Sequence, residues 1–157
     1  MASGFALLKR LADEPVQLME TTFKLEFIHM KALFLIGRTM LGGFFIYNGV
    51  HHFQETKGMA QYAGAKNIPN PETAVLASGA LMVAGGASMV LGLKPRWGAL
   101  SIIGFLATAS PLFHDFWNEN DPQAKQQQMI HFSKNMAILG GALALAGIED
   151  WPLSITD

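Results

Sequence analysis

The most constraining feature of this sequence is the stretch from Thr73 to Phe113, which contains no acidic residue and only two basic ones, Lys94 and Arg96. Residues 73–93 are free of charge over about the 20 residues that a helix needs to cross the hydrocarbon core of a bilayer. They also lack the polar stripe of a helix on the surface of a soluble core. A second apolar run, residues 97–113, follows after a short turn. The sequence therefore predicts an antiparallel membrane hairpin.

Two further apolar runs flank this hairpin, at residues 33–53 and 130–148. Four crossings place both termini on one side of the membrane. Backbone polar groups in lipid must be satisfied within each segment, so we expect helices. The predicted fold is an all-α integral membrane four-helix bundle. Its expected domain is residues 33–148, between an N-terminal extension (1–32) and a short C-terminal tail (149–157).

Basic residues close to the spans predict the orientation, because they favour the cytoplasmic side. The side that holds the termini and the central turn carries most of them: Lys9, Arg10, Lys24, Lys31, Lys94 and Arg96. The two loops on the opposite side carry only Lys57, Lys66 and Lys125. We therefore expect both termini in the cytoplasm.

The N-terminal extension mixes apolar and charged residues. Its apolar members are Phe5, Leu7, Leu8, Leu11, Phe23, Phe27, Ile28 and Met30. This pattern predicts one or two short helices lying in the cytoplasmic interface. A docking arm for a partner subunit explains the same pattern. Asp13 and Glu14 interrupt the early apolar residues, so we expect no cleavable signal.

Composition excludes several functional classes. A net charge of −1 and the lack of a basic run argue against a nucleic-acid partner. The absence of cysteine excludes membrane enzymes that shuttle disulfides through a Cys-x-x-Cys pair. With 157 residues, one bundle leaves no room for a separate catalytic domain. We expect no self-sufficient enzyme, and any difficult chemistry would need a cofactor or a partner.

Polar residues at membrane depth carry the functional signal, because ionisable groups there are costly and usually face the bundle interior. Asn48, His51, His52 and Glu55 follow i, i+3, i+4, i+7 spacing and share one helix face. The topology brings the end of the first span, the end of the third and the start of the fourth to one non-cytoplasmic level. The resulting candidate cluster is His51, His52, Glu55, His114, Asp115, Trp117, His131, Lys134 and Asn135.

This cluster has more than one interpretation. In a structural one, Asp115 and Lys134 form an ion pair that closes the bundle, and the histidines lie at headgroup level. In a functional one, it binds a quinone head group, with His114 and Asp115 as candidate catalytic proton partners. The expected apolar walls of that site are Tyr47, Phe53, Phe113, Phe116 and Trp117.

Metal and haem binding are weaker interpretations of the same cluster. His51, His114, Asp115 and His131 are suitable metal ligands by type, but no spacing is specific for a metal, so we predict no metal site. Two of the histidines would also suit haem, although haem ligands usually lie deeper in a bundle. No cofactor is established by the sequence, and quinone is the one that the cluster suits best.

Arg38 stands apart from this cluster. It lies about 21 Å from His52 along a helix that rises 1.5 Å per residue, and hence in the cytoplasmic half of the first span. We expect its side chain to extend to the lipid headgroups. Anchoring a partner or a substrate anion is the functional alternative.

Small residues predict where the helices pack closely. Small-xxx-small spacing occurs in three spans, at Ala80, Ala84 and Ser88, at Gly104 and Thr108, and at Gly140 and Ala144. We expect these positions to form the packing seams of the bundle.

The order of these features resembles the DoxX family of small four-helix bacterial membrane proteins. The resemblance covers about residues 33–147. It is carried by Gly37-Arg38, Gly42 and Gly49 in the first span, Gly85-Gly86 in the second, His114-Asp115-Phe116-Trp117 after the third, and His131-Phe132 with Lys134-Asn135 in the fourth. The long N-terminal extension is unusual for the family.

The resemblance implies a bacterial inner-membrane protein linked to redox enzymes, since the family is named from a membrane subunit of quinone-linked sulfur oxidation. A related animal group assists membrane-protein assembly. We expect an accessory subunit of a larger membrane redox complex, bound through its glycine-rich helices and N-terminal arm. The alternative is a quinone-binding oxidoreductase subunit, in which Lys134 and Asn135 orient the head group. The expected partners are the lipid bilayer and other membrane subunits.

Overall fold

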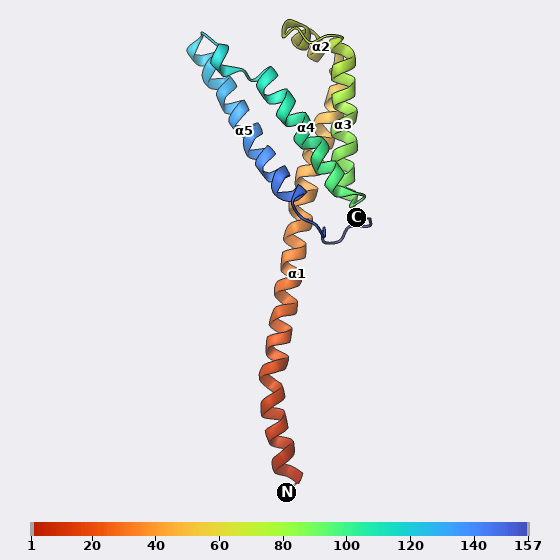
Figure 1. Cartoon of the computed structure of the whole chain (residues 1–157), viewed down its shortest axis with the longest axis vertical. Coiled ribbons are helices and arrows are strands. Elements are labelled where there is room, and N and C mark those ends of the chain that lie inside the picture. Colours follow the sequence, from red (N-terminus) through yellow and green to blue (C-terminus); the bar gives the residue numbers. More distant parts are fainter. Residues whose placement is uncertain (1, 157) are drawn as a thin grey trace. The chain divides into compact units, whose positions relative to one another are not determined.

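A computed structural model of the chain describes the backbone of residues 2–156 and the side chains of residues 16–156 (Figure 1). Five α-helices and one 3-10 helix make up the described part: α1 (Ala2–Gln54), α2 (Thr56–Ala65), α3 (Pro71–Leu91), α4 (Pro95–Phe113), η1 (Phe116–Asn118) and α5 (Pro122–Ala146). Four of the helices are long and apolar enough to cross a membrane. The all-α membrane architecture predicted from the sequence is thereby confirmed.

The chain divides into two compact units, residues 1–36 and residues 37–157, and the boundary falls inside α1. In the first unit, the expected short helices are replaced by one continuous helix, since α1 runs unbroken from Ala2 to Gln54. The side chains of Phe5, Leu7, Leu8 and Leu11 lie outside the described residues. The interfacial location of the extension stays a prediction.

Proline sets the start of three helices. Pro71, Pro95 and Pro122 occupy the first turns of α3, α4 and α5, where a missing N–H costs nothing. Asp121 caps α5 by accepting a hydrogen bond from the Ala124 amide at 2.7 Å. Helix α5 therefore begins two polar turns before residue 130, where the predicted fourth span starts.

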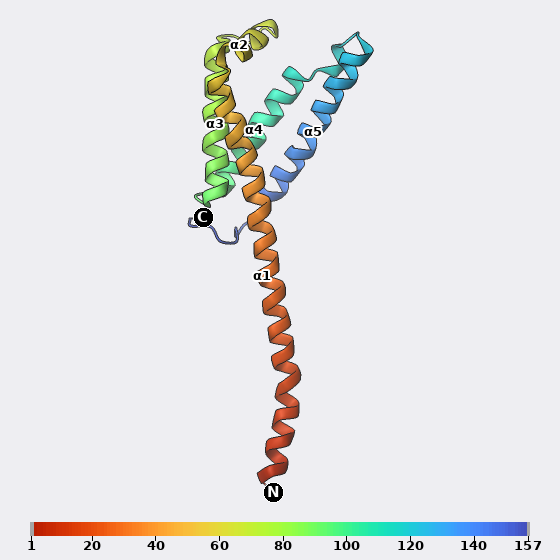
Figure 2. The same cartoon turned by 180° about the vertical axis from the view of Figure 1, so that it is seen from behind.

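Two pairs of glycines bring α1 and α3 into backbone contact in the second unit, where the helices run antiparallel (Figure 2). A Cβ added at Gly42 would lie 2.6 Å from the carbonyl oxygen of Gly86, and one added at Gly49 would lie 2.7 Å from that of Gly79. Both pairs are seven residues apart on each helix. We call these four residues the glycine seam.

The glycine seam corrects the packing prediction. A Cβ at Gly104 or Gly140 would meet nothing within 4 Å, so these glycines do not mediate close packing. Between α3 and α4 the close approach is instead at Gly85 and Gly98, where a Cβ on Gly98 would lie 2.5 Å from the Gly85 carbonyl oxygen. The buried side chains Phe45, Met82, Met89, Ile102 and Leu106 fill the space around these contacts.

The C-terminal tail docks on the turn between α3 and α4. The amide of Ile155 donates to the Gly92 carbonyl at 2.8 Å, and the Lys94 amide donates to the Thr156 hydroxyl oxygen at 3.0 Å. Gly92 adopts a φ of +70°, which a residue with a side chain would adopt only with strain. The tail thus completes the end of the bundle that holds this turn.

Arg38 is part of this end of the bundle. Its side chain is 2% exposed and donates hydrogen bonds to the carbonyl oxygens of Pro152 (3.2 Å) and Leu153 (2.9 Å). The expectation that Arg38 reaches the lipid headgroups is therefore wrong. A buried guanidinium needs acceptors, and the tail supplies two of them.

Candidate functional site

A cavity of about 1090 Å³ opens among the helices at the end of the bundle opposite the Lys94 turn. Its walls come from α1, α2, α3, α4 and α5 in the second unit. Of the nine residues in the predicted cluster, six line it: His51, His52, Glu55, His114, Lys134 and Asn135. Three do not: Asp115, Trp117 and His131. Six of the predicted residues thus share one cavity, whereas the other three lie outside it.

One wall of the cavity is the polar face of α1. Asn48, His51, His52 and Glu55 all line it, as their shared helix face implies. Asn48 donates to the carbonyl of Phe44 one turn earlier, at 2.7 Å. The polar wall is therefore a continuous strip at the end of α1.

The apolar walls differ from those predicted. Phe113 lines the cavity, but Tyr47 is 73% exposed, and Tyr47, Phe53, Phe116 and Trp117 lie elsewhere. The aromatic side chains that do line it are Phe44, Phe45, Tyr62, Phe105 and Phe113. Phe105 is the central one, because its ring stands edge-on to both Phe45 and His52.

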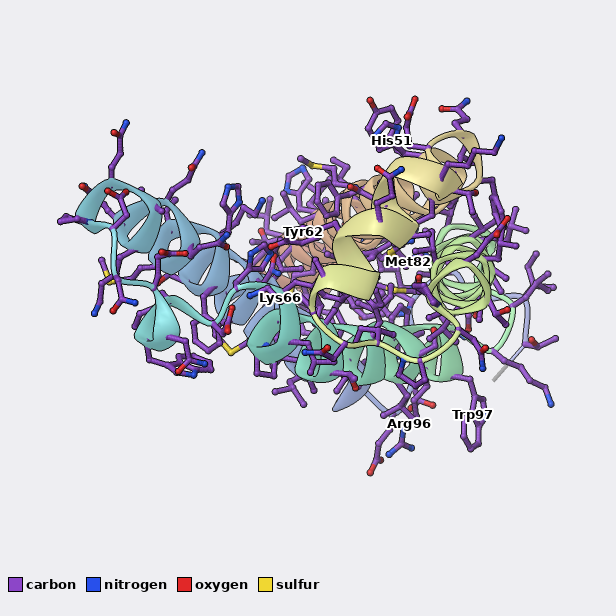
Figure 3. The ribbon with its side chains drawn as sticks, turned by 90° about the horizontal axis from the view of Figure 1, so that it is seen from above. His51, Tyr62, Lys66, Met82, Arg96 and Trp97 are labelled. Carbon is purple, nitrogen blue, oxygen red and sulfur yellow. The ribbon has the colours of Figure 1, made fainter. Side chains whose placement is uncertain are left out.

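Helix α2 was not predicted, although it covers one side of the cavity with Gly58, Met59, Tyr62 and Ala63. Tyr62, which is labelled in Figure 3, stacks on Phe113 with ring centroids 5.7 Å apart. Its hydroxyl donates to the Phe113 carbonyl at 3.1 Å. A sequence signal for this face exists, since Met59, Tyr62, Ala63 and Lys66 follow i, i+3, i+4, i+7 spacing.

Asp115 is ion-paired with Lys66, the C-cap residue of α2, and not with Lys134. This corrects the predicted Asp115–Lys134 pair. The second carboxylate oxygen of Asp115 accepts a hydrogen bond from Asn118 at 3.2 Å. The hydrogen bond to Asp115 raises the pKa of Lys66 above the ordinary lysine value. Asp115 is thus engaged in holding α2 and does not line the cavity as a proton donor.

His114 and His131 stack on each other, with ring centroids 5.2 Å apart and planes 19° from parallel. The Nδ1 atom of His114 also lies 2.8 Å from the Gln128 side-chain oxygen. Trp117 belongs to an aromatic group with Phe116 and Phe132. His131 and Trp117 therefore pack the junction of η1 and α5 behind the cavity.

His52 is the most firmly positioned polar side chain of the cavity. Its Nδ1 atom lies 2.9 Å from the hydroxyl oxygen of Ser78 and 3.3 Å from the carbonyl oxygen of Val75, both on α3. A Cβ on Gly79 would lie 2.9 Å from the His52 Cβ, so the glycine seam is what lets His52 approach α3. Ser78 and Gly79 were not singled out from the sequence.

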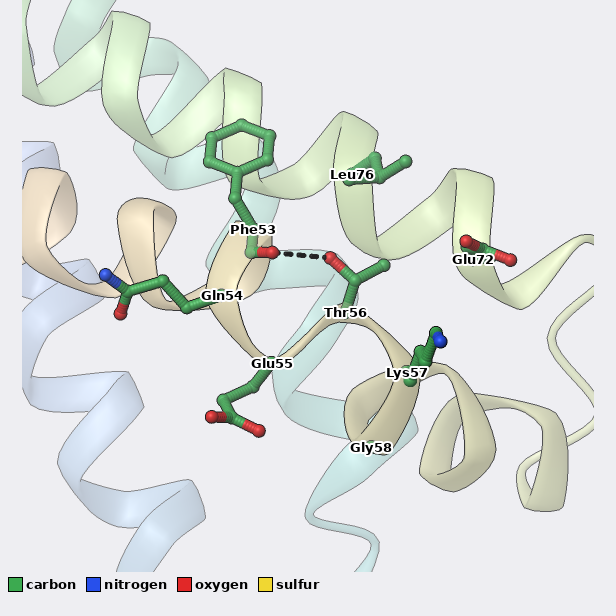
Figure 4. A pocket seen from close by; sticks show the side chains of 8 residues that line it. All are labelled: Phe53, Gln54, Glu55, Thr56, Lys57, Gly58, Glu72 and Leu76. Atoms are coloured by element: carbon green, nitrogen blue, oxygen red, sulfur yellow. Dashed lines mark hydrogen bonds between the residues drawn. The ribbon is translucent and has the colours of Figure 1, made fainter.

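A smaller pocket of about 410 Å³ lies at the junction of α1 and α2 against α3 (Figure 4). Thr56 closes this junction by donating to the Phe53 carbonyl at 3.0 Å. Glu55, Lys57 and Glu72 are exposed around it. Across the side chains of residues 16–156, no three His, Asp or Glu residues come together in a group that could hold a metal ion.

These features define a multi-pass α-helical membrane protein with a partly polar cavity at one end of its bundle. The DoxX family model matches residues 33–115, more than half of the chain. The chain belongs to the DoxX family. No curated protein and no solved structure matches it. The matched region contains α2 and the α1, α3 and α4 walls of the cavity, whereas Lys134 and Asn135 lie beyond it.

Proposed function

We propose that this DoxX protein binds a quinone-type ligand in the cavity formed by α1 to α5. The observation that carries the proposal is the composition of this cavity: aromatic and aliphatic walls with a few convergent polar groups. Its volume of about 1090 Å³ is slightly above the range of about 300–1,000 Å³ that is usual for small-molecule sites. An aromatic head group with an apolar tail has the matching chemistry.

The polar groups of the cavity support a ligand with polar atoms at opposite ends of a ring. His51 and His52 lie on α1, while Lys134 and Asn135 lie on α5. Lys134 is a donor only, Asn135 both donates and accepts, and neutral histidine accepts through one ring nitrogen. The aromatic rings of Phe105 and Tyr62 line the space between these walls. Such an arrangement suits a planar ring with two oxygens.

Quinone binding is tested by native mass spectrometry of the protein extracted from its own membranes in mild detergent. The matched variants are Gly104→Leu and Gly140→Leu. Gly104 lines the cavity and Gly140 does not, and a Cβ at either meets nothing within 4 Å. We expect Gly104→Leu to lose bound quinone and Gly140→Leu to keep it. Quinone bound equally by both variants would place it elsewhere, and its absence from the unmodified protein would contradict the proposal.

We propose a bacterial inner-membrane location with both termini in the cytoplasm, which puts the cavity at the non-cytoplasmic end. The basic residues near Lys94 support this orientation. Because the chain has no cysteine, single cysteines introduced at Ser154 and at Gln126 can report it. Only the second should react with a membrane-impermeant thiol reagent in intact cells. The reverse labelling would invert the topology.

A second candidate function, an accessory subunit of a membrane redox complex, is supported by the first unit. Among its described side chains, from residue 16 onward, five apolar ones are more than 60% exposed: Leu18, Met19, Phe23, Met30 and Leu33. Glu20, Lys24, Glu26 and Lys31 are interspersed among them, which makes lipid alone an unsuitable environment. Deletion of residues 1–31 should release a bound partner while the second unit stays folded. Continued co-purification with the partner would count against this role.

A further inference from the structure

His52 makes one well-defined set of hydrogen bonds, all through Nδ1. Nδ1 lies 2.9 Å from Ser78 Oγ and 3.3 Å from the Val75 carbonyl oxygen. The hydroxyl of Ser78 itself donates to the Val75 carbonyl, at 2.9 Å. Three polar atoms on two helices thus form a closed triangle.

This triangle favours one position for the proton of the His52 ring. The Val75 carbonyl only accepts, and it lies within hydrogen-bond distance of both the Ser78 hydroxyl oxygen and His52 Nδ1. A protonated Nδ1 can donate within the triangle while the Ser78 hydroxyl donates to the Val75 carbonyl, so this tautomer gives each of the three atoms a partner. With Nδ1 unprotonated, its lone pair would face the Val75 oxygen at 3.3 Å without a proton between them. In the neutral ring, Nε2 is then the unprotonated acceptor.

Among the residues whose side chains the structure describes, the hydrogen bonds of the His52 ring all run through Nδ1, which leaves Nε2 without a protein partner. The ring itself lines the cavity and stands edge-on to Phe105, 6.3 Å away between centroids. An acceptor held in a fixed ring orientation at the wall of the cavity favours a ligand that supplies a donor, because an unpaired polar atom beside a bound ligand is costly.

We propose that His52 makes the cavity selective for the hydroxyl-bearing form of its ligand, a hydroquinone or related phenol, over the carbonyl-bearing quinone. The hydroquinone O–H donates to Nε2 of His52. A quinone carbonyl oxygen has no proton to donate, so its lone pair would face the lone pair of Nε2. Ser78 and Val75 act as positioning groups that hold the tautomer. This inference rests on the proposed quinone-type site and adds which redox form the site prefers.

Binding to the full chain in lipid nanodiscs, measured by anaerobic isothermal titration calorimetry, tests the selectivity. The probes are a short-tailed 1,4-benzoquinol, its quinone and the quinol dimethyl ether, which keeps the ring but has no donor. We expect the quinol to bind about fivefold more tightly than either of the others, the usual net effect of one hydrogen bond. His52→Asn keeps an amide donor at the δ position and lacks the Nε2 acceptor. It should remove the quinol preference, so that the quinol and its dimethyl ether bind to this variant with equal affinity.

The tautomer is measured independently of any ligand by nitrogen NMR of the histidine-labelled protein. His52 should show a protonated Nδ1 and an unprotonated Nε2, with its signals assigned through Ser78→Ala if His52→Asn does not fold. A protonated Nε2 overturns the inference. Equal affinity for all three probes also overturns it and leaves the proposed quinone-type site intact. Failure of all three probes to bind would instead contradict the proposed function.

Discussion

Lys66, the residue that caps the C-terminus of α2, is ion-paired with Asp115, a residue 49 positions later that follows the end of α4. Tyr62, one turn before Lys66, contacts Phe113 at the end of α4 through both its ring and its hydroxyl. Two side chains at the C-terminal end of α2 therefore attach this short helix to α4 beside the cavity. The position of α2 depends on these contacts, since a helix of ten residues is marginal in isolation.

The Lys66–Asp115 pair predicts a stability that falls at alkaline pH. Asp115 raises the pKa of Lys66 above the ordinary value of 10.5. Because the folded-state pKa is the higher one, the contribution is fully present below pH 10.5 and is lost as pH rises through the folded-state pKa. A partly exposed pair of this kind contributes about 0.2–1 kcal/mol. Hydrogen exchange of the α2 amides should be faster in Asp115→Asn than in the unmodified protein, and the difference should vanish above that pKa.

Tyr62 lies one turn before Lys66 and contributes to its raised pKa, so Tyr62→Phe serves as the control for the pH experiment. In this variant the Asp115-dependent difference should persist with the same pH profile. If the difference between the Asp115→Asn and unmodified proteins were constant up to strongly alkaline pH, the ion pair would not be its source.

The glycine seam predicts opposite effects for two glycines of α1. Gly49→Ala places a Cβ 2.7 Å from the Gly79 carbonyl oxygen, whereas Gly43→Ala places one in open space. Overpacking of this kind costs about 1–3 kcal/mol. The control should be neutral or more stable by up to about 1 kcal/mol, since alanine favours a helix. Equilibrium unfolding in mixed micelles measures both, and equal stability of the two variants would refute the close approach of α1 and α3.

The hydrogen bonds of Arg38 predict that its replacement will detach the C-terminal tail from the bundle. Arg38→Met removes both hydrogen bonds to the Pro152 and Leu153 carbonyls, which are worth about 1.5–3 kcal/mol each when the donor is charged. We expect faster hydrogen exchange at Ile155 and Thr156 and faster digestion of the tail by carboxypeptidase. Arg96→Met, at an exposed position of the same end, is the matched control. Digestion at the same rate in the two variants would show that the tail docks without Arg38.

Much of the fold follows from hydropathy alone, because the bilayer fixes the length and the apolar character of each span. The shared face of Asn48, His51, His52 and Glu55 also follows, since helix periodicity decides it before any packing. Helix periodicity does not show, however, which residues of a shared face lie at the level of the cavity. His131 and Asn135 lie four residues apart, yet Asn135 lines the cavity and His131 stacks on His114.

The contacts of Arg38 and of the closely packed glycines could not be predicted from the sequence of the spans. Arg38 lies more than a hundred residues from the tail that binds it, and nothing periodic links the two. Gly104 and Gly140 have the spacing of packing residues but face open space, whereas Gly42, Gly49, Gly79 and Gly86 pack closely at an interval of seven. The spacing of small residues shows where two helices could pack closely. Which of these residues are in close contact depends on where the two helices cross.

The division of the predicted cluster into residues that line the cavity and residues behind it yields the sharpest test of the site. Asn135→Leu replaces a polar group of the cavity by an apolar one of similar size and removes one hydrogen bond to the ligand, so the Kd for a quinone-type ligand should rise about fivefold to tenfold. Trp117→Phe changes an aromatic side chain that lies outside the cavity and should leave the Kd unchanged. Titration calorimetry on both variants, with circular dichroism to establish that each is folded, measures the difference. A Kd that rises for Trp117→Phe and not for Asn135→Leu would move the ligand from the cavity to the aromatic group at η1.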